Sequence, residues 1–120
     1  MLALTSIALG ASAIGCVDQQ IFGPSYLPRA TAAKAISDPL AHDDALRTVA
    51  LRAIQDGDAV VANEAVDAFH DDQIRDDVAA RCARWLGEHW RAGEATVLAK
   101  KIGDVILRDR VLKQIATGKA

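Results

Sequence analysis

The chain matches itself at a constant 33-residue offset, and this periodicity constrains its fold more than any other feature. Ile36-Ser37-Asp38 falls on Phe69-His70-Asp71 and on Ile102-Gly103-Asp104. Further columns in the same register are Asp43, Asp76 and Asp109; Val49, Cys82 and Ile115; and Ala50, Ala83 and Ala116. A fixed period of this kind is typical of chains that stack one supersecondary unit. Residues 29–118 are therefore predicted to form one repeat domain.

Each unit contains two apolar stripes at helical spacing, separated by an aspartate. Asp38, Asp71 and Asp104 occupy this break, where a carboxylate can accept from the first amides of the next helix. Pro39 then has the N1 position that proline favours. The predicted helices are 29–37, 40–56, 58–70, 73–91, 94–103 and 105–117.

Composition agrees with an all-α class. Half of the 120 residues are apolar, but only 4% are aromatic, and alanine dominates the apolar share. Alanine favours helices that pack closely, and this length suits a single core. Gly57-Asp58 and Gly93-Glu94 are expected to mark equivalent return turns. Aligning these glycines makes the 73–91 helix roughly one turn longer than its equivalent.

The pattern resembles tetratricopeptide repeats. Gly57-Asp58 with Ala62 and Val66 is similar to the start of that family's second helix. The Ala50, Ala83 and Ala116 column lies where the family keeps a small residue. The resemblance implies three helical hairpins in a short right-handed α-solenoid, a concave surface that binds a protein or peptide, and no chemistry.

The segment from Met1 to Val17 contains no charged side chain. This apolar run is short for a membrane span, which needs about 20 residues, but it fits the apolar region of an export signal. Ala13-Ile14-Gly15-Cys16 resembles a bacterial lipobox, which implies cleavage before Cys16 and its lipidation. The alternatives are an uncleaved apolar helix in a membrane or on a partner, and an ordinary core helix. Residues 1–15 are thus a signal or anchor, and residues 16–28 a tether.

Charge is unevenly distributed along the chain. The net charge is only −2, which gives no reason to expect nucleic acid as a partner. However, residues 38–77 contain eleven acidic and three basic side chains, and residues 78–120 contain nine basic and four acidic ones. The two halves are either solvated faces or an association surface. The basic candidates for that surface are Lys100, Lys101, Arg108, Arg110 and Lys113.

Few residues suggest chemistry. His42-Asp43-Asp44 and His70-Asp71-Asp72 look alike, but their separation is shorter than the repeat offset, so they are not equivalent in the repeat. Asp71 is better explained as a cap and the other aspartates as solvated first-turn acids, without a metal. Cys82 shares a column with Val49 and Ile115, which predicts a buried thiol. No nucleophile set, phosphate loop or metal motif has usable spacing, so neither an enzyme nor a cofactor is expected.

Trp85, His89 and Trp90 are grouped near the end of the 73–91 helix. They either cover the end of the hairpin or provide a binding anchor formed by His89 and Trp90, because exposed aromatic residues often carry interface energy. The expected function is a membrane-tethered, extracytoplasmic scaffold that binds another protein, on the periplasmic side in a Gram-negative bacterium, with self-association as a further option. The alternative is a soluble intracellular adaptor whose apolar N-terminal helix caps the solenoid.

Overall fold

The computed structural model describes residues 25–119, and within this range the chain forms six helices and no strand. They are α3 (Leu27–Lys34), α4 (Pro39–Gln55), α5 (Ala59–Ala68), α6 (Asp72–Glu88), α7 (Ala92–Ala99) and α8 (Val105–Thr117). The predicted all-α class is confirmed. Cys16 and the predicted signal segment lie outside the described residues.

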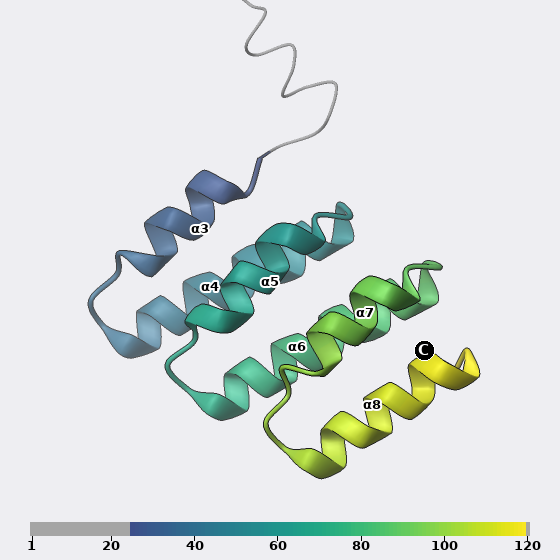
Figure 1. Cartoon of the computed structure of the whole chain (residues 1–120). Coiled ribbons are helices and arrows are strands. Elements are labelled where there is room, and N and C mark those ends of the chain that lie inside the picture. The colour runs from purple at the N-terminus through teal and green to yellow at the C-terminus, as the bar shows by residue number, and fades with distance from the viewer. Residues whose placement is uncertain (1–24, 120) are drawn as a thin grey trace, which may run out of the picture.

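The helices lie side by side in two layers, and consecutive helices run in opposite directions (Figure 1). Helix α6 contacts both α4 and α8 in one layer, while α3 contacts α5 in the other. The periodicity of the sequence is present in the helix starts, because α4, α6 and α8 begin at Pro39, Asp72 and Val105. Helices α5 and α7 begin at Ala59 and Ala92, which keep the same spacing.

The three aspartates at the breaks are N-caps, as predicted. Asp38 accepts a hydrogen bond from the amide of Ala41 at 2.9 Å. Asp71 accepts from the amides of the second and third residues of α6, and Asp104 does the same for α8. Pro39 is the first residue of α4, as expected. Each cap satisfies amides that the helix itself cannot pair.

The core runs along the line between the two layers. Its largest fully buried apolar side chains are Leu46, Val66, Val78, Leu86, Leu98, Ile102 and Val111. Ala50 and Ala83 are completely buried, as a close helix crossing requires. Cys82 is also buried, as predicted, and burial raises the pKa of its thiol to about 12. The thiol is therefore protonated and unreactive at neutral pH.

The predicted extra length of the 73–91 helix is wrong. Helix α6 ends at Glu88 and has 17 residues, the same as α4. The residue equivalent to Gly57 is Trp90, not Gly93, because both Gly57 and Trp90 have left-handed backbones, with φ of 82° and 65°. Gly93 lies inside the first turn of α7. The glycine signal therefore indicates the wrong turn position, and the helix predicted at 94–103 is instead α7 at Ala92–Ala99. The last helix has the predicted bounds, 105–117.

A candidate protein-binding surface at the α8 end

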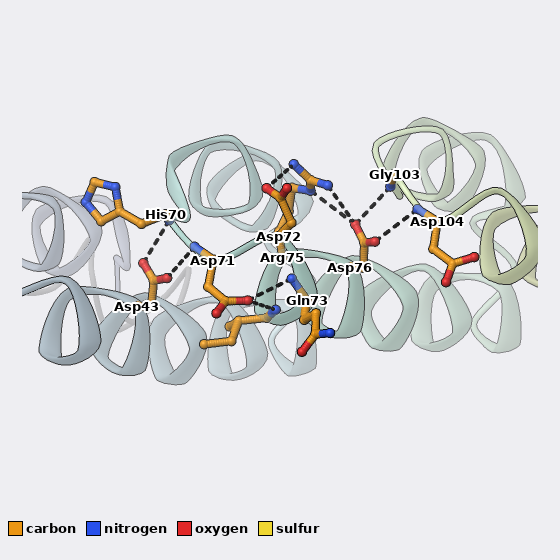
Figure 2. Close-up of polar contacts among 10 residues, drawn as sticks. Asp43, His70, Asp71, Asp72, Gln73, Arg75, Asp76, Gly103 and Asp104 are labelled. Atoms are coloured by element: carbon orange, nitrogen blue, oxygen red, sulfur yellow. Dashed lines mark hydrogen bonds and ion pairs between the residues drawn. The ribbon is translucent and has the colours of Figure 1, made fainter.

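Asp43 joins α4 to the linker between α5 and α6 (Figure 2). Its carboxylate accepts from the backbone amides of His70 at 3.0 Å and Asp71 at 2.8 Å. The ring Nδ1 of His42 lies 2.8 Å from the same carboxylate. Burial alone would raise the pKa of Asp43, but these hydrogen bonds outweigh it and hold the pKa below its usual range. The expectation of a solvated acid is wrong here, because only 2% of Asp43 is exposed.

Asp76 makes the same arrangement one unit later (Figure 2). It accepts from the amides of Gly103 at 2.9 Å and Asp104 at 3.0 Å, which are 27 and 28 residues ahead, as His70 and Asp71 are for Asp43. Arg75 Nε donates to Asp76 at 3.1 Å. Burial opposes ionisation of Asp76 too, but the hydrogen bonds and Arg75 lower its pKa. We call each aspartate with its two linker amides a clasp.

The residue directly before each clasp aspartate packs against the linker residue that the clasp holds. In the first clasp this residue is His42, and its ring lies 4.2 Å from that of His70. In the second it is Arg75, opposite Gly103, where an added Cβ would lie 2.5 Å from the guanidinium. The flat ring of His42 thus packs against a histidine, and the longer Arg75 packs against a glycine. The second junction is built around this close approach.

A third aspartate in the same column is exposed. The side chain of Asp109 on α8 is 69% exposed, and Arg108 Nε lies 3.8 Å from its carboxylate. Leu112 is half-buried and Ala116 exposed, whereas their equivalents Leu46, Ala79, Ala50 and Ala83 are completely buried. Asp109, Leu112 and Ala116 define what we call the outer face of α8. This face exposes the positions that α4 and α6 bury.

Trp90 lies at one edge of the same end of the molecule. Its side chain is 96% exposed, and its left-handed backbone is disfavoured for a residue with a Cβ. It borders a depression of about 530 Å³ between the α6–α7 turn and α8. The lining residues are Gly87, Glu88, Trp90, Ala92, Ile115, Ala116, Thr117 and Gly118. Ala116 therefore belongs to both the depression and the outer face of α8.

The other predicted aromatic anchor, His89, has a different environment. Its ring stacks on Trp85, with centroids 3.6 Å apart and planes 10° apart, and its Nδ1 is 2.7 Å from the Trp85 carbonyl oxygen. Trp85 is half-buried and packs on the core. The rings of Trp85 and His89 cover the end of the hairpin, whereas almost the whole side chain of Trp90 is exposed to solvent. Sequence spacing could not separate the two roles.

The predicted basic residues do not form one set. Lys101 Nζ is 2.8 Å from the Asp67 carboxylate and joins the end of α7 to α5, so it stabilises the fold. Arg108 is half-buried beside Asp109. The remaining three, Lys100, Arg110 and Lys113, are exposed. Of these, Arg110 and Lys113 lie on α8, whereas Lys100 directly follows α7.

The two His-Asp-Asp motifs meet in space, although sequence reasoning keeps them apart. His42, Asp43 and His70 share the first clasp. Within residues 25–119, however, no three metal-ligating side chains are arranged to hold an ion. None of the helices in that range combines the length and apolar character needed to cross a bilayer.

Comparisons with protein families, curated proteins and solved structures found no match for the chain.

Proposed function

We propose that the protein is a helical-repeat scaffold, a short tetratricopeptide-like α-solenoid, that binds another protein at its α8 end. The observation that carries this proposal is Trp90, a large apolar side chain that is 96% exposed on a left-handed backbone. Such a backbone costs of order 1–3 kcal/mol for a residue with a Cβ, and helices commonly end on it with glycine. Glycine serves at the equivalent turn, so tryptophan is not needed there for folding.

The surroundings of Trp90 support binding of a protein and not of a small ion. Trp90 borders a depression with apolar and small lining residues, and tryptophan is enriched among residues that dominate interface energies. Exposed Arg110 and Lys113 on α8 favour a partner whose contact surface is acidic. The expected partner therefore inserts an apolar side chain beside Trp90 and carries acidic residues around it.

Trp90→Gly tests this site without harming the fold. Glycine tolerates the left-handed backbone, so we expect the free energy of unfolding to rise by about 1 kcal/mol. We expect binding to be lost in the same variant. A photo-activated cross-linking amino acid at position 90 should capture a defined protein from native membranes, and an excess of unlabelled wild-type chain, but not of Trp90→Gly chain, should compete.

Position 60 provides the matched control. Val60 is also an exposed apolar residue, 69% exposed at the start of α5, but it does not line the depression. The same cross-linker at position 60 should not give the product seen at position 90. Identical products at both positions, or equal competition by Trp90→Gly, would contradict the proposed site.

We also propose that the scaffold is held at the extracytoplasmic face of a membrane through lipidated Cys16. The support is the lipobox-like Ala13-Ile14-Gly15-Cys16 after an uncharged run. Cys16→Ser should move the protein from the membrane to the soluble fraction. Intact mass should show a chain that begins at Cys16 and carries lipid mass. A chain that retains Met1 without lipid would instead favour the intracellular adaptor.

A further inference from the structure

We propose that the outer face of α8 binds the linker before α4 of a second copy, so that copies join head to tail. This inference rests on the repeat architecture of the proposed function and names a partner for its α8 end. The contact would reproduce the junction that the chain already makes twice, at Asp43 and at Asp76.

The acceptor side of this junction is complete on α8. Asp109 occupies the clasp position and Arg108 the position of the neighbouring cation. Leu112 and Ala116 supply the positions that α4 and α6 bury against the next unit. In the two junctions within the chain, the clasp aspartates Asp43 and Asp76 are almost fully buried, and each accepts from two backbone amides. Asp109 has the same chemistry and no such cover within the described residues.

The donor side is complete in the linker before α4. The positions equivalent to His70-Asp71 and Gly103-Asp104 are Ser37-Asp38, and among residues 25–119 no acceptor pairs with the two backbone amides of Ser37 and Asp38. All three linkers have the same shape at the cap, with φ and ψ of −70° and 121° at Asp38, −92° and 122° at Asp71, and −71° and 113° at Asp104.

The pairing of cation and linker residue also fits. Arg75 accompanies the smallest linker residue, Gly103, because its guanidinium lies close to that backbone. Arg108 is again an arginine, and the residue it would meet is the small Ser37. Because serine has a Cβ, the flexible guanidinium of Arg108 would lie farther from the linker than that of Arg75 lies from Gly103. The new junction would therefore share its aspartate and arginine with the second junction, but with looser contact at the linker residue.

Apolar burial completes the match. Ala41 is exposed and Ala45 half-buried on α4, whereas their equivalents on α6 are the half-buried Ile74 and the fully buried Val78. Within residues 25–119, α4 thus lacks cover on the side that faces away from α6, as α8 does on its outer face. The excess of acid in residues 38–77 and of base in residues 78–120 would attract unlike ends over a Debye length of about 8 Å.

The test measures the mass of the full chain in mild detergent by sedimentation velocity over a range of concentrations. Ala116→Arg should block the outer face of α8, and Ala41→Arg should block the opposite end. Both alanines are exposed, so neither change disturbs the monomer. Each variant alone should remain monomeric, but an equimolar mixture should form a one-to-one dimer and nothing larger, because only one compatible pair of ends remains.

Asp109→Ala tests the clasp itself and should weaken association at least tenfold, since hydrogen bonds to a charged group contribute about 1.5 kcal/mol or more. Asp77→Ala is the matched control. It removes one carboxylate that is 49% exposed and lies early in α6, away from both ends, so association should be unchanged. Raising salt from about 50 to 500 mM should weaken the wild-type contact.

A wild-type chain that stays monomeric at every concentration would overturn the inference, and so would association that persists in both arginine variants. Equal weakening by Asp109→Ala and Asp77→Ala would also overturn it, because the clasp would then have no special role. A monomer that still gives the specific cross-link at position 90 would leave the proposed function intact. Head-to-tail assembly without that cross-link would support the inference and contradict the proposed binding site at Trp90.

Discussion

Asp43 and Asp109 are the same residue type in one repeat pattern, and their surroundings make them opposite in character. Asp43 is enclosed by the linker after α5 and accepts two backbone amides. The side chain of Asp109 is 69% exposed, and Arg108 Nε lies 3.8 Å from its carboxylate. A buried carboxylate stabilises a fold when its hydrogen bonds exceed the cost of its burial. Asp109 is therefore a control for Asp43, because it has the same side chain without the two amide partners.

Asp43→Asn should destabilise the fold by roughly 1–3 kcal/mol at neutral pH. The amide oxygen of asparagine can accept from one linker amide, but its NH₂ group cannot accept from the other, which is left buried without a partner. Asp109→Asn should change the free energy of unfolding by less than about 0.5 kcal/mol, as exposed substitutions usually do. Chemical denaturation of both variants under dilute, monomeric conditions provides the measurement.

The pH dependence of this difference follows from the lowered pKa of Asp43. Its stabilising effect is complete above the unfolded pKa of about 4 and is lost as the pH falls through the lower folded pKa. The gap in the free energy of unfolding between wild type and Asp43→Asn should therefore narrow as the pH falls. A gap that stays constant down to a pH of about 2, below the ordinary range of an aspartate, or equal losses at positions 43 and 109, would be inconsistent with the clasp.

At the scale of helices, packing depends on the alanines that allow α4 and α6 to approach their neighbours. Ala50 and Ala83 have no exposed surface, whereas Ala116 in the same column is exposed. The sequence column predicts three equivalent crossings. The structure contains two of them, because no described helix packs over α8 at Ala116. Burial at a repeated position depends on whether the next unit is present, which a column of residues cannot reveal.

Ala83→Leu should cost roughly 1–3 kcal/mol through overpacking at this crossing. For a domain of this size, that corresponds to a fall in Tm of roughly 4–8 °C for each kcal/mol. Ala116→Leu is the control and should leave Tm almost unchanged, because the added atoms meet solvent. Thermal unfolding followed by circular dichroism measures both. Equal shifts at positions 83 and 116 would disprove the assignment of the crossing.

Much of the helical pattern could be predicted because it depends on local rules. Caps at Asp38, Asp71 and Asp104 follow from an aspartate directly before an apolar stripe. The predicted boundary near Trp90 is wrong because glycine is the usual left-handed residue, and Gly93-Glu94 resembles Gly57-Asp58. The clasps could not be predicted for another reason. Their partners are backbone amides 27 and 28 residues away. Nearly every residue has such an amide, so the residue types do not indicate which amides are bound.

Across the whole molecule, neighbouring units are joined at both ends of their helices. The clasps hold the linker end, and Arg91 Nη1 donates to the Gly57 carbonyl at 2.8 Å at the turn end. Lys101 and Asp67 add a contact at the linker end, where α5 and α7 finish. At the start of the described chain, the Tyr26 hydroxyl donates to Asp56 at 2.5 Å and closes α3 onto the end of α4. Rigid stacking therefore depends on a few polar contacts around an alanine-rich core.

Each clasp links residues at the same separation along the chain, so its geometry does not depend on how many units the chain contains. A tandem duplication of residues 72–104 would give the new α6 an aspartate cap, the new clasp its two amides, and the crossing its alanine. An insertion of any other length between two units would displace all three at once. Growth of such a gene is therefore expected in steps of one whole repeat, and shorter or longer changes are expected to be confined to the two ends.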